Sequence, residues 1–542
     1  MTLKNSLVYI NQFFFFISSQ ARKIYLNSNI YNKKISRGAI NKLIYKPSPS
    51  FLNCLIKYSK KIDINNFVLE EVWLKKNLKE KDFKNLNNFF WLFTLDLNSS
   101  KKEVQSVIAK WIDYNGKYNE RTWDNDILSK RIISWISNSK ITYENSNEDY
   151  KTKFNETIKR QINHLINEIN RSKWVDDKMI SCSAIILAGL AYNDKKNILQ
   201  YGLNLLKKII KFSLDKNYFP KSRNIRQLNF FLKYLIIIRE WLKESQNDIP
   251  EFLDEVIFYI GQSYTLIHKD VSEPFLFNGN QFTKKIEFEN YLKRLGYNFK
   301  TESHLAGGYA FLKNNKYCLA MDIGNSPEKN FSNDYQSGAL SFELISNKKK
   351  VIVNSGYFQK NKHQLNFISK TTACQSTLSI QNHSSAQFNR RPDGFIKIDN
   401  SIKTNNKKVF KSKNHWSIEA SHDGYFKRFG IIHNRKIDFF IDKEKLIGVD
   451  KIYKKKKLKQ SNFEIRFHLH PDTKIMKTQD GKSIYIDLNN EGWKFSGKNC
   501  NINFETGLFF GLKNQFVENQ NILISNEIDK DEIEIIWELE KI

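Results

Sequence analysis

Residues 463–471 read Phe-Glu-Ile-Arg-Phe-His-Leu-His-Pro, and this stretch decides the fold class of the second half of the chain. Its apolar residues alternate strictly with polar ones, and a period of two is typical of a strand with one buried face. Residues 484–488 continue the alternation, and the short apolar run 351–353 ends at the turn sequence Asn354-Ser355-Gly356. Short strands separated by such turns predict an antiparallel β-sandwich rather than a βαβ unit.

Upstream of this region, residues 59–297 have a helical period. Apolar residues recur there at steps of three and four: Ile158, Ile162, Leu165 and Ile169; Leu199, Leu203, Leu206 and Ile210; Leu228, Phe231, Leu235, Ile238 and Leu242. Successive helices with short connectors predict antiparallel hairpins, which can stack as a bundle, a solenoid or a toroid. We therefore expect an α+β multidomain chain: a poorly defined segment 1–58, an almost entirely helical domain 59–297, and a domain 300–542 in which residues 305–540 are strand and loop.

The composition excludes several classes of protein. The 542 residues are 40% hydrophobic, which is ample for a core. The net charge of +30 has two interpretations: solvated lysines without a partner, or attraction to a polyanion such as nucleic acid, an anionic membrane or an acidic polysaccharide. The sequence contains no recognisable nucleic-acid-binding module, so nucleic acid is not expected. It also contains no uninterrupted apolar stretch long enough for a transmembrane span.

Neither the cysteines nor the N-terminus point to a specialised site. The five cysteines are far apart and form no CxxC pair, which argues against a disulfide framework or a zinc ribbon. The apolar run from Leu7 to Ile17 is interrupted by Asn11-Gln12 and is a poor secretory signal. A short buried or membrane-surface helix explains it at least as well.

Motifs for nucleotide hydrolases, Rossmann enzymes, zincins and α/β hydrolases are absent from the sequence. Residues 416–425 (WSIEASHDGY) place His422 at the end of a strand beside a turn, where an imidazole is exposed yet anchored. The alternative is a turn histidine capped by Asp423. His468 and His470 lie two residues apart and could chelate a metal, but no third ligand is indicated, so we predict no metal site.

Several motifs occur in a telling order: SFEL (341–344), VIVNSG (351–356), TACQSTL (372–378), EASHDGY (419–425), RFHLHP (466–471) and NEGWKFS (490–496). Together they resemble the C-terminal domain of heparinase II/III-type polysaccharide lyases. Trp111-Ile112, the segment 123–135 and PKSRN (220–224) resemble the helical domain of the same family. The resemblance covers about residues 85–540 and implies an incomplete α/α toroid followed by an antiparallel β-sandwich, with a substrate cleft between them.

The resemblance implies β-elimination on a uronic-acid polysaccharide. A carboxylate must be neutralised, a base must remove the C5 proton, and an acid must protonate the leaving oxygen. Tyr and His usually share the last two roles in the family, and Asn, Arg or Gln binds the carboxylate. No cofactor is required.

The sequence departs from the family pattern at important positions. Gln336 and Gln375 stand where many members have His. Glutamine can donate a hydrogen bond but cannot exchange a proton near neutral pH, which weakens the case for catalysis. The family's Asn-His pair in the toroid is not recognisable, because residues 176–179 (DDKM) occupy that region. Zinc binding in part of the family relies on His in the same β segment, so zinc is not expected here.

The site residues that we predict fall into two groups. The catalytic candidates are His422, Tyr425 and Tyr218; the substrate-binding candidates are Arg223, Lys221, Asn224, Gln336 and Gln375. Residues 221–224 lie in a break between helical runs, where they suit a carboxylate or sulfate, although capping of the helix that starts near Ile225 explains them equally well. Tyr218 has burial in a packing contact as its alternative. We expect Arg131 to pair with a carboxylate inside the toroid, and Arg223, Gln336, Gln375 and His422 to converge on one cleft.

Two functions remain open. The first is a polysaccharide lyase acting on an acidic, uronate-containing glycan. The second is a catalytically impaired protein of the same fold that binds glycans or assembles cell-envelope polysaccharide. The resemblance favours the cell envelope or periplasm as its location, with the cytoplasm as the alternative, and the sequence indicates no oligomeric state.

Overall fold

The computed structural model describes residues 16–38, 42–55, 78–95, 101–192, 197–280, 286–391, 394–456, 461–498, 500–512 and 515–542. The chain divides into two compact units. The first comprises Met1–Phe212 and Phe230–Ile257, and the second comprises Ser213–Asn229 and Phe258–Ile542. Most of the N-terminal run Leu7 to Ile17 lies outside the described residues.

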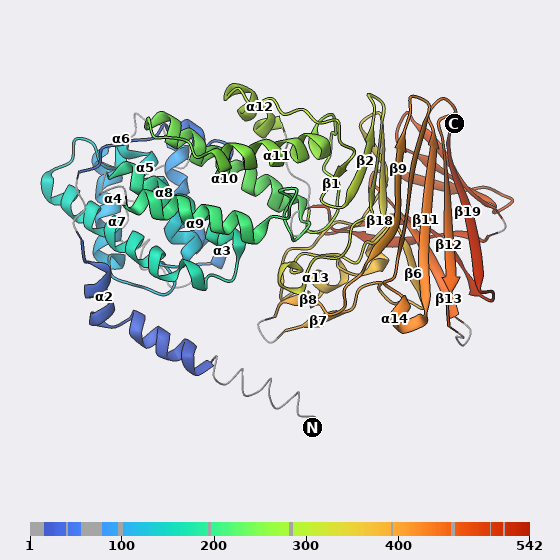
Figure 1. Cartoon of the computed structure of the whole chain (residues 1–542), viewed down its shortest axis with the longest axis horizontal. Helices are drawn as coiled ribbons and strands as arrows, with labels where there is room; N and C mark the ends of the chain where they lie inside the picture. The colour runs from blue at the N-terminus through green and yellow to red at the C-terminus, as the bar shows by residue number, and fades with distance from the viewer. Residues whose placement is uncertain are drawn as a thin grey trace. The chain divides into compact units, whose positions relative to one another are not determined.

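Helices dominate the described residues up to residue 294 (blue to green in Figure 1). They are α2 (Asn29–Ile35), α3 (Glu80–Asn87), α4 (Lys101–Asn115), α5 (Asn125–Ser137), α6 (Ser139–Thr142), α7 (Glu148–Glu168), α8 (Val175–Ala191), α9 (Asn197–Ser213), α10 (Ile225–Glu244), α11 (Glu251–His268) and α12 (Ile286–Arg294). The prediction of a helical region is therefore confirmed for the described residues, whereas residues 59–77 of the predicted span lie outside them. No described helix is long and apolar enough to cross a membrane.

Helix α7 shows how the local sequence sets these elements. The side chain of Asn147 accepts a hydrogen bond from the N–H of Tyr150 and caps the first turn, where Glu148 and Asp149 complement the helix dipole. The residues on its apolar stripe, which include Ile158 and Ile162, are fully buried. The predicted amphipathic face is thus the face that packs into the helical core.

Arg131 of α5 does not pair with a carboxylate, so that expectation is wrong. It is fully buried and donates hydrogen bonds to the carbonyl oxygens of Asn87 and Thr122 and to Oε1 of Gln161. Its guanidinium also stacks 4.1 Å from the ring centre of Trp111. Carbonyl dipoles and an aromatic face take the place of the expected acid.

The rest of the second unit consists mainly of two antiparallel sheets (yellow to red in Figure 1). The nine-stranded sheet contains β1 (Leu305–Ala306), β2 (Tyr309–Lys313), β3 (Tyr317–Asp322), β4 (Phe342–Ser346), β5 (Lys349–Val353), β13 (Ser461–Leu469), β18 (Val517–Ile528) and β17 (Ile502–Phe509) in that order, with β6 (Leu378–Ile380) also beside β13. The eight-stranded sheet has the order β14 (Lys474–Lys477), β15 (Ser483–Asp487), β16 (Gly492–Lys498), β19 (Glu532–Lys541), β12 (Lys445–Lys454), β11 (Ile431–Phe440), β10 (His415–His422) and β9 (Thr404–Lys411).

The inner faces of the two sheets share one hydrophobic core. Trp537 of β19 lies 5.4 Å from Phe342 of β4 and 4.7 Å from Phe467 of β13, measured between ring centres. Phe463, Ile465, Phe467 and Leu469 all lie in this core, so the alternation of residues 463–471 identified the buried face correctly. Aromatic pairs of this kind add about 0.5–1.5 kcal/mol beyond the area that they bury.

Only short helices interrupt the described strands after residue 305. These are α13 (Gln364–Ile368) and α14 (Phe426–Phe429), and the hairpin β7 (Phe388–Arg390) and β8 (Ile396–Ile398) lies apart from both sheets. The prediction that residues 305–540 are strand and loop is confirmed.

Candidate functional site

Tyr218 lies in a tight loop that precedes α10. The backbones of Leu214 and Pro220 are bridged, and Oδ1 of Asp215 accepts hydrogen bonds from the N–H groups of Asn217 and Phe219. Tyr218 has a φ of 57°, in the left-handed region that costs a non-glycine residue free energy. Its ring stacks on Tyr259 with 5.2 Å between the ring centres. Because Tyr218 is only half-buried, its phenol is the most accessible of the three predicted catalytic groups.

Arg223 uses all of its N–H groups within the chain. It donates to the carbonyl oxygens of Gly307, Gly308, Gly324 and Asn325 and, at 2.6 Å, to the carboxylate of Asp322. Burial opposes its charge, but Asp322 more than offsets this and raises the pKa of Arg223. Because no donor remains for a substrate carboxylate, we reassign Arg223 from substrate binding to a structural role.

Asn224 caps α10, so the capping interpretation is confirmed for this residue. Its Oδ1 accepts from the N–H groups of Arg226 and Gln227, while its Nδ2 donates to Asp334 at 2.8 Å. Arg226 donates to the same carboxylate oxygen at 3.1 Å. Lys221 is half-buried, and its ammonium lies 5.7 Å from the ring centre of Phe331.

Gln336 belongs to the same hydrogen-bonded network. Its Nε2 donates to the carbonyl oxygens of Gly356 and Ser369, and its Oε1 accepts from the N–H of Gly279. Its own N–H donates to Asn278, which also bonds to Asp322, the partner of Arg223. The network joins Gln336 to Arg223, but the Gln336 amide has no polar atom left for a substrate.

Gln375 differs from Gln336 in one respect. Both side chains are 1% exposed, but Nε2 of Gln375 has no hydrogen-bond partner among the described residues. Ser341 Oγ is equally unpartnered, and a Cβ on Gly338 would lie 3.0 Å from this oxygen and 3.1 Å from Oε1 of Gln375. An unpaired buried donor costs about 1–3 kcal/mol, so this place is under-satisfied as it stands.

His422 is 1% exposed, so the expectation that the turn exposes its imidazole is wrong. Its Nδ1 accepts from the N–H of Gly424, and its Nε2 lies 3.2 Å from Nδ1 of His433. His433 continues the chain to Asp450 at 2.6 Å, and Arg435 clamps the same carboxylate. Burial lowers the pKa of His433 below its usual value and that of His422 well below it. Both imidazoles are therefore neutral at pH 7.

Tyr425 is also buried, and its hydroxyl donates to the carbonyl oxygen of Leu378 at 2.8 Å. Burial raises the pKa of Tyr425 above its usual range. Arg223, Gln336, Gln375 and His422 are all at most 7% exposed, so they do not line an open cleft as we expected. Except for Gln375, whose Nε2 has no partner among the described residues, these buried side chains have satisfied polar groups, as is typical of a structural core.

His468 also has partners within the chain. Its Nδ1 lies 3.0 Å from the hydroxyl of Ser355, and its Nε2 lies 2.9 Å from the carbonyl oxygen of Ala373. Among the residues that the structure describes, no group of three or more His, Cys, Asp or Glu side chains is placed to hold a metal.

Lys370 is a feature that the sequence analysis missed. Its side chain is fully buried, and its ammonium donates to the carbonyl oxygens of Asn333 and Ile396. Burial lowers the pKa of Lys370 to about 8, and Asp334 only partly opposes this. A sequence signal existed, because Lys370 is the single Lys, Arg, Asp or Glu between Lys362 and Arg390.

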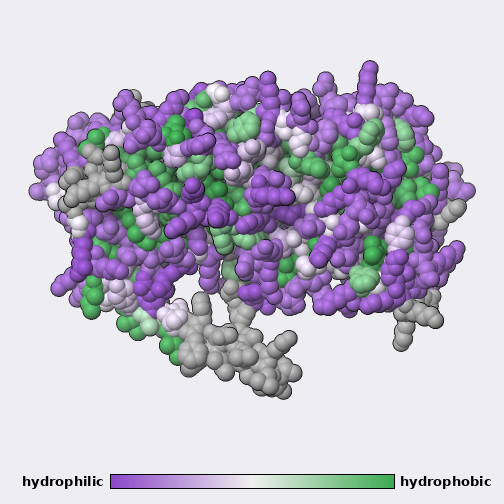
Figure 2. All heavy atoms as spheres, viewed as in Figure 1, coloured by the Kyte–Doolittle hydropathy of each residue, from purple (hydrophilic) through white to green (hydrophobic). Residues whose placement is uncertain are grey.

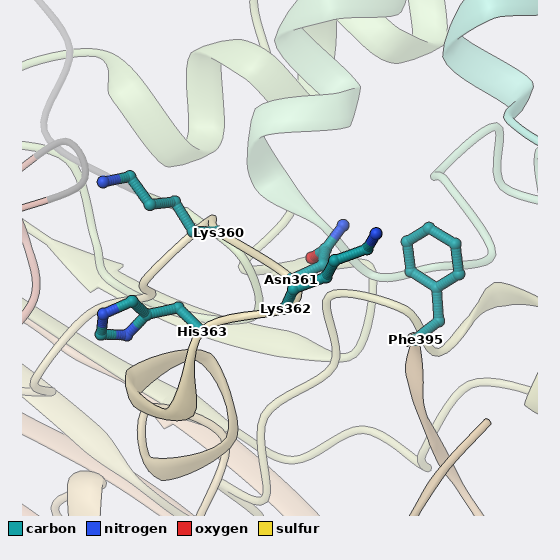
Figure 3. A pocket seen from close by; sticks show the side chains of 5 residues that line it. All are labelled: Lys360, Asn361, Lys362, His363 and Phe395. Carbon is teal, nitrogen blue, oxygen red and sulfur yellow. The ribbon is translucent and has the colours of Figure 1, made fainter. Parts of the chain in front are cut away.

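An open pocket of about 470 Å³ lies at residues 360–363, in the segment that leads to Lys370 (Figure 3). It is lined by Lys360, Asn361, Lys362, His363 and Phe395. The figure shows Asn361 and Lys362 on the side of the Phe395 ring, with Lys360 and His363 on the other side of the loop. This pocket combines three basic side chains with an amide and a phenyl ring. Such a lining suits an anionic, partly apolar ligand.

Comparison with known families and structures fits this architecture. Residues 299–538 match the family model described as heparinase II/III-like, C-terminal. The matched region covers almost all of the chain after residue 298. The family resemblance drawn from the ordered motifs of this half is therefore confirmed.

Solved structures resemble the chain over almost its whole length. A mutant of the heparan sulfate lyase HepC from Pedobacter heparinus has a TM-score of 0.69 at 12% identity, covering 96% of this chain and 88% of that one. A crystal structure of heparinase III has a TM-score of 0.68 at 14% identity, with 97% and 90% covered. The expected fold class, a helical toroid followed by a β-sandwich, is confirmed. A search of curated protein sequences finds no match.

Proposed function

We propose that this protein is a polysaccharide lyase that cleaves a uronic-acid-containing polysaccharide by β-elimination. The observation that carries the proposal is the heparinase II/III-like domain, in a chain whose fold follows that of heparan sulfate lyases over 96% of its length. The reaction needs a base, an acid and positive charge near the carboxylate, and it needs no cofactor.

Tyr218 is the group that we assign to proton transfer. It is the one half-exposed side chain of the three original catalytic candidates, and a strained loop holds it three residues from Lys221. Lys221 and the partly exposed Arg226 supply positive charge on the same segment. Strained residues that project from a fixed loop are common at catalytic sites.

The alternative is an acidic-glycan-binding or cell-envelope assembly protein of the same fold without turnover. The buried state of His422 and Tyr425, and the complete hydrogen bonding of Gln336, favour it. Neither imidazole nor phenol can exchange protons with a substrate from these positions. Both functions require the protein to bind a polyanion. They differ in whether the bound polysaccharide is cleaved.

The deciding measurement is the ultraviolet absorbance of unsaturated uronates, with heparan sulfate, heparin, alginate and bacterial capsular glycans as substrates. The lyase proposal expects a product signal that Tyr218→Phe lowers about 100- to 10,000-fold in kcat. Tyr259→Phe is the matched control and should change kcat little, because its ring supports stacking without supplying a proton. Binding without any signal would reject the lyase in favour of the alternative.

The double change Gln336→His with Gln375→His tests whether the site has lost activity. A gain of absorbance over the wild type would indicate a decayed lyase site. We expect no gain from Gln336→His, because imidazole cannot replace all three of the hydrogen bonds that the Gln336 amide makes.

We also propose the cell envelope or periplasm as the location, because acidic polysaccharide is encountered there. Fractionation of cells that express the full-length chain tests this. Recovery of the whole population in the cytosol would reject it.

A further inference from the structure

The walls of the pocket beside Lys370 are fixed to one another by hydrogen bonds. Nδ2 of Asn366 donates to the carbonyl oxygen of Phe358 at 2.6 Å, and the N–H of Phe358 donates to Ser369 Oγ, which holds the loop that carries residues 360–363. The buried ammonium of Lys370 donates to the carbonyl oxygen of Ile396, the neighbour of Phe395. Lys370 therefore ties the segment that follows residues 360–363 to Ile396, the first residue of β8 and the neighbour of Phe395.

The two sides of the pocket, residues 360–363 and residues 394–395, also contact each other at the surface. Gly394 has a φ of 85°, and a Cβ at that position would lie 3.4 Å from Cγ of Lys362. The stem of Lys362 thus lies beside Gly394, the residue before Phe395, while the Lys362 side chain remains exposed. The N–H of Arg391 donates to the carbonyl oxygen of Phe395 at 2.7 Å, which helps to fix the backbone that carries the ring.

The charges around the pocket are one-sided. Its lining holds two lysines and a histidine but no acid. Neither Lys360 nor Lys362 forms an ion pair with any carboxylate of the described residues, whereas Lys329, Lys408 and Lys451 elsewhere in the unit all do. Figure 2 shows that hydrophilic residues cover most of the face in view.

We propose that this pocket binds one anionic sugar unit of an acidic polysaccharide, with the pyranose ring against Phe395 and its carboxylate or sulfate at Lys362 and Lys360. The inference deepens the proposed function, because it gives the substrate a subsite. A phenyl face takes up the apolar C–H face of a sugar, and Asn361 can donate to and accept from its hydroxyls. Two ammonium groups without carboxylate partners neutralise the anion.

The test measures the affinity of the full-length chain for size-defined heparan sulfate oligosaccharides and for alginate oligosaccharides. Phe395→Ala together with Lys362→Gln should weaken binding about tenfold or more, because two of the main contacts are lost. The matched control pairs Phe367→Ala, an exposed phenylalanine on α13 outside the pocket, with Lys408→Gln, and should stay within about twofold. Equal losses in the two double variants would overturn the proposal.

A measurement on the wild type removes dependence on how the variants fold. Bound oligosaccharide should protect Lys360 and Lys362 from amine acylation, read by mass spectrometry, and should leave Lys408 as reactive as before. Absence of protection, absence of binding, or equal affinity for a neutral oligosaccharide would each overturn the subsite. Alginate and heparan sulfate separate carboxylate from sulfate as the anion that is held.

The proposed subsite and the proposed catalysis can fail separately. If oligosaccharide binding depends on the pocket while no unsaturated product forms, the subsite stands and the lyase proposal falls. If product forms and the pocket variants leave KM unchanged, the lyase stands and the subsite falls. With both correct, the pocket variants raise KM and change kcat little, because binding remote from the reacting atoms is lost.

Discussion

Lys370 carries a positive charge into a place where carbonyl oxygens, rather than a carboxylate, surround it. These neutral acceptors only partly offset the cost of removing the ammonium from water, and the pKa of Lys370 therefore falls to about 8. Lys370 connects two segments of the fold, because the two carbonyl oxygens that it holds belong to Asn333, beside Asp334, and to Ile396 of β8, beside Phe395.

Because of this pKa shift, the free energy of unfolding of the second unit should change with pH in the alkaline range. Below the native pKa of about 8 Lys370 is charged in both states, and the full cost of burying the charge is present. Between about 8 and the usual 10.5 the unfolded chain keeps the proton that the native chain has lost, so stability rises with pH by about 3 kcal/mol in total.

The control is Lys370→Met, which removes the titration. Urea unfolding at pH 7, 9 and 10, followed by tryptophan fluorescence, should show wild type gaining stability relative to this variant as pH rises. Parallel curves for the two proteins would contradict the buried, destabilised ammonium. Other groups that titrate in the same range cancel in the difference.

Arg223 gives a second prediction at the scale of one residue. Arg223→Met leaves the carboxylate of Asp322 buried without its cationic partner and removes a hydrogen bond from each of four carbonyl oxygens. We expect a loss of about 3–5 kcal/mol in the free energy of unfolding. Arg223→Lys should recover only part of this, because an ammonium cannot reproduce the guanidinium's planar fork.

Chemical denaturation of the three proteins measures the effect. A substrate-binding Arg223 would predict the reverse pattern, with stability retained and glycan affinity lost. That pattern would restore the original assignment.

Single residues were the hardest level to predict from sequence. Arg223, Gln336 and His422 stand in the motif segments that carry the family resemblance, but the sequence does not say which polar atoms the fold itself consumes. Their partners lie up to about a hundred positions away in the chain, as with Arg223 and Asp322. Asn224 was easier, because an Asn directly before a helical run is a local capping signal.

At the level of elements, strands β11, β12 and β19 enclose a charged group in the sandwich core. Arg435 of β11 lies opposite Asp450 of β12 and clamps its carboxylate, which also accepts from the indole of Trp537 on β19. Burial opposes the charge on Asp450, but Arg435 and His433 outweigh it and hold its pKa far below its usual range. The pair has no exposed side-chain area.

Arg435→Met should therefore cost about 3–5 kcal/mol of unfolding free energy, because it strands a buried carboxylate. The double variant Arg435→Met with Asp450→Leu should recover much of that loss, since replacing both charges leaves an apolar contact in the core. Thermal and urea denaturation of the single and double variants give the coupling energy. A double variant as unstable as the single one would mean that the ion pair is not the source of the loss.

Element types followed from sequence better than element partners did. The period of two in residues 463–471 identified β13 and its buried face, but not that β5, β6 and β18 are its neighbours. Strand β9 shows a further limit: between Asn405 and Lys408 its register with β10 shifts through a bulge. A bulge adds one residue to a strand and so breaks the alternation on which such predictions depend.

At the scale of the whole chain, the two-part fold was readable because helix and strand periods change near residue 300. The compact units do not divide at that point, since Ser213–Asn229 and Phe258–Tyr297 group with the strands. Within the second unit Arg223 contacts Asp322 and Asn224 contacts Asp334, so these hydrogen bonds link residues about a hundred positions apart. Sequence periodicity carries no information about such contacts.

The net charge of +30 leads to a prediction for the whole molecule. Like charges repel one another in the compact state, so simple salt should stabilise the chain by screening. Raising NaCl from 10 to 100 mM shortens the screening length from about 30 to about 10 Å, and we expect the melting temperature to rise over this range.

If the proposed function is correct, heparan sulfate should act differently from salt, because it would bind at particular cations of the native state. At a fixed ionic strength it should raise the melting temperature further, in proportion to the logarithm of its concentration once that exceeds Kd. Calorimetry with NaCl, sodium sulfate and heparan sulfate at matched ionic strength separates the two effects. If heparan sulfate gave no more than the shift of matched salt, the excess positive charge would be solvated lysine without a glycan partner, and both the binding and the catalytic proposals would lose their electrostatic basis.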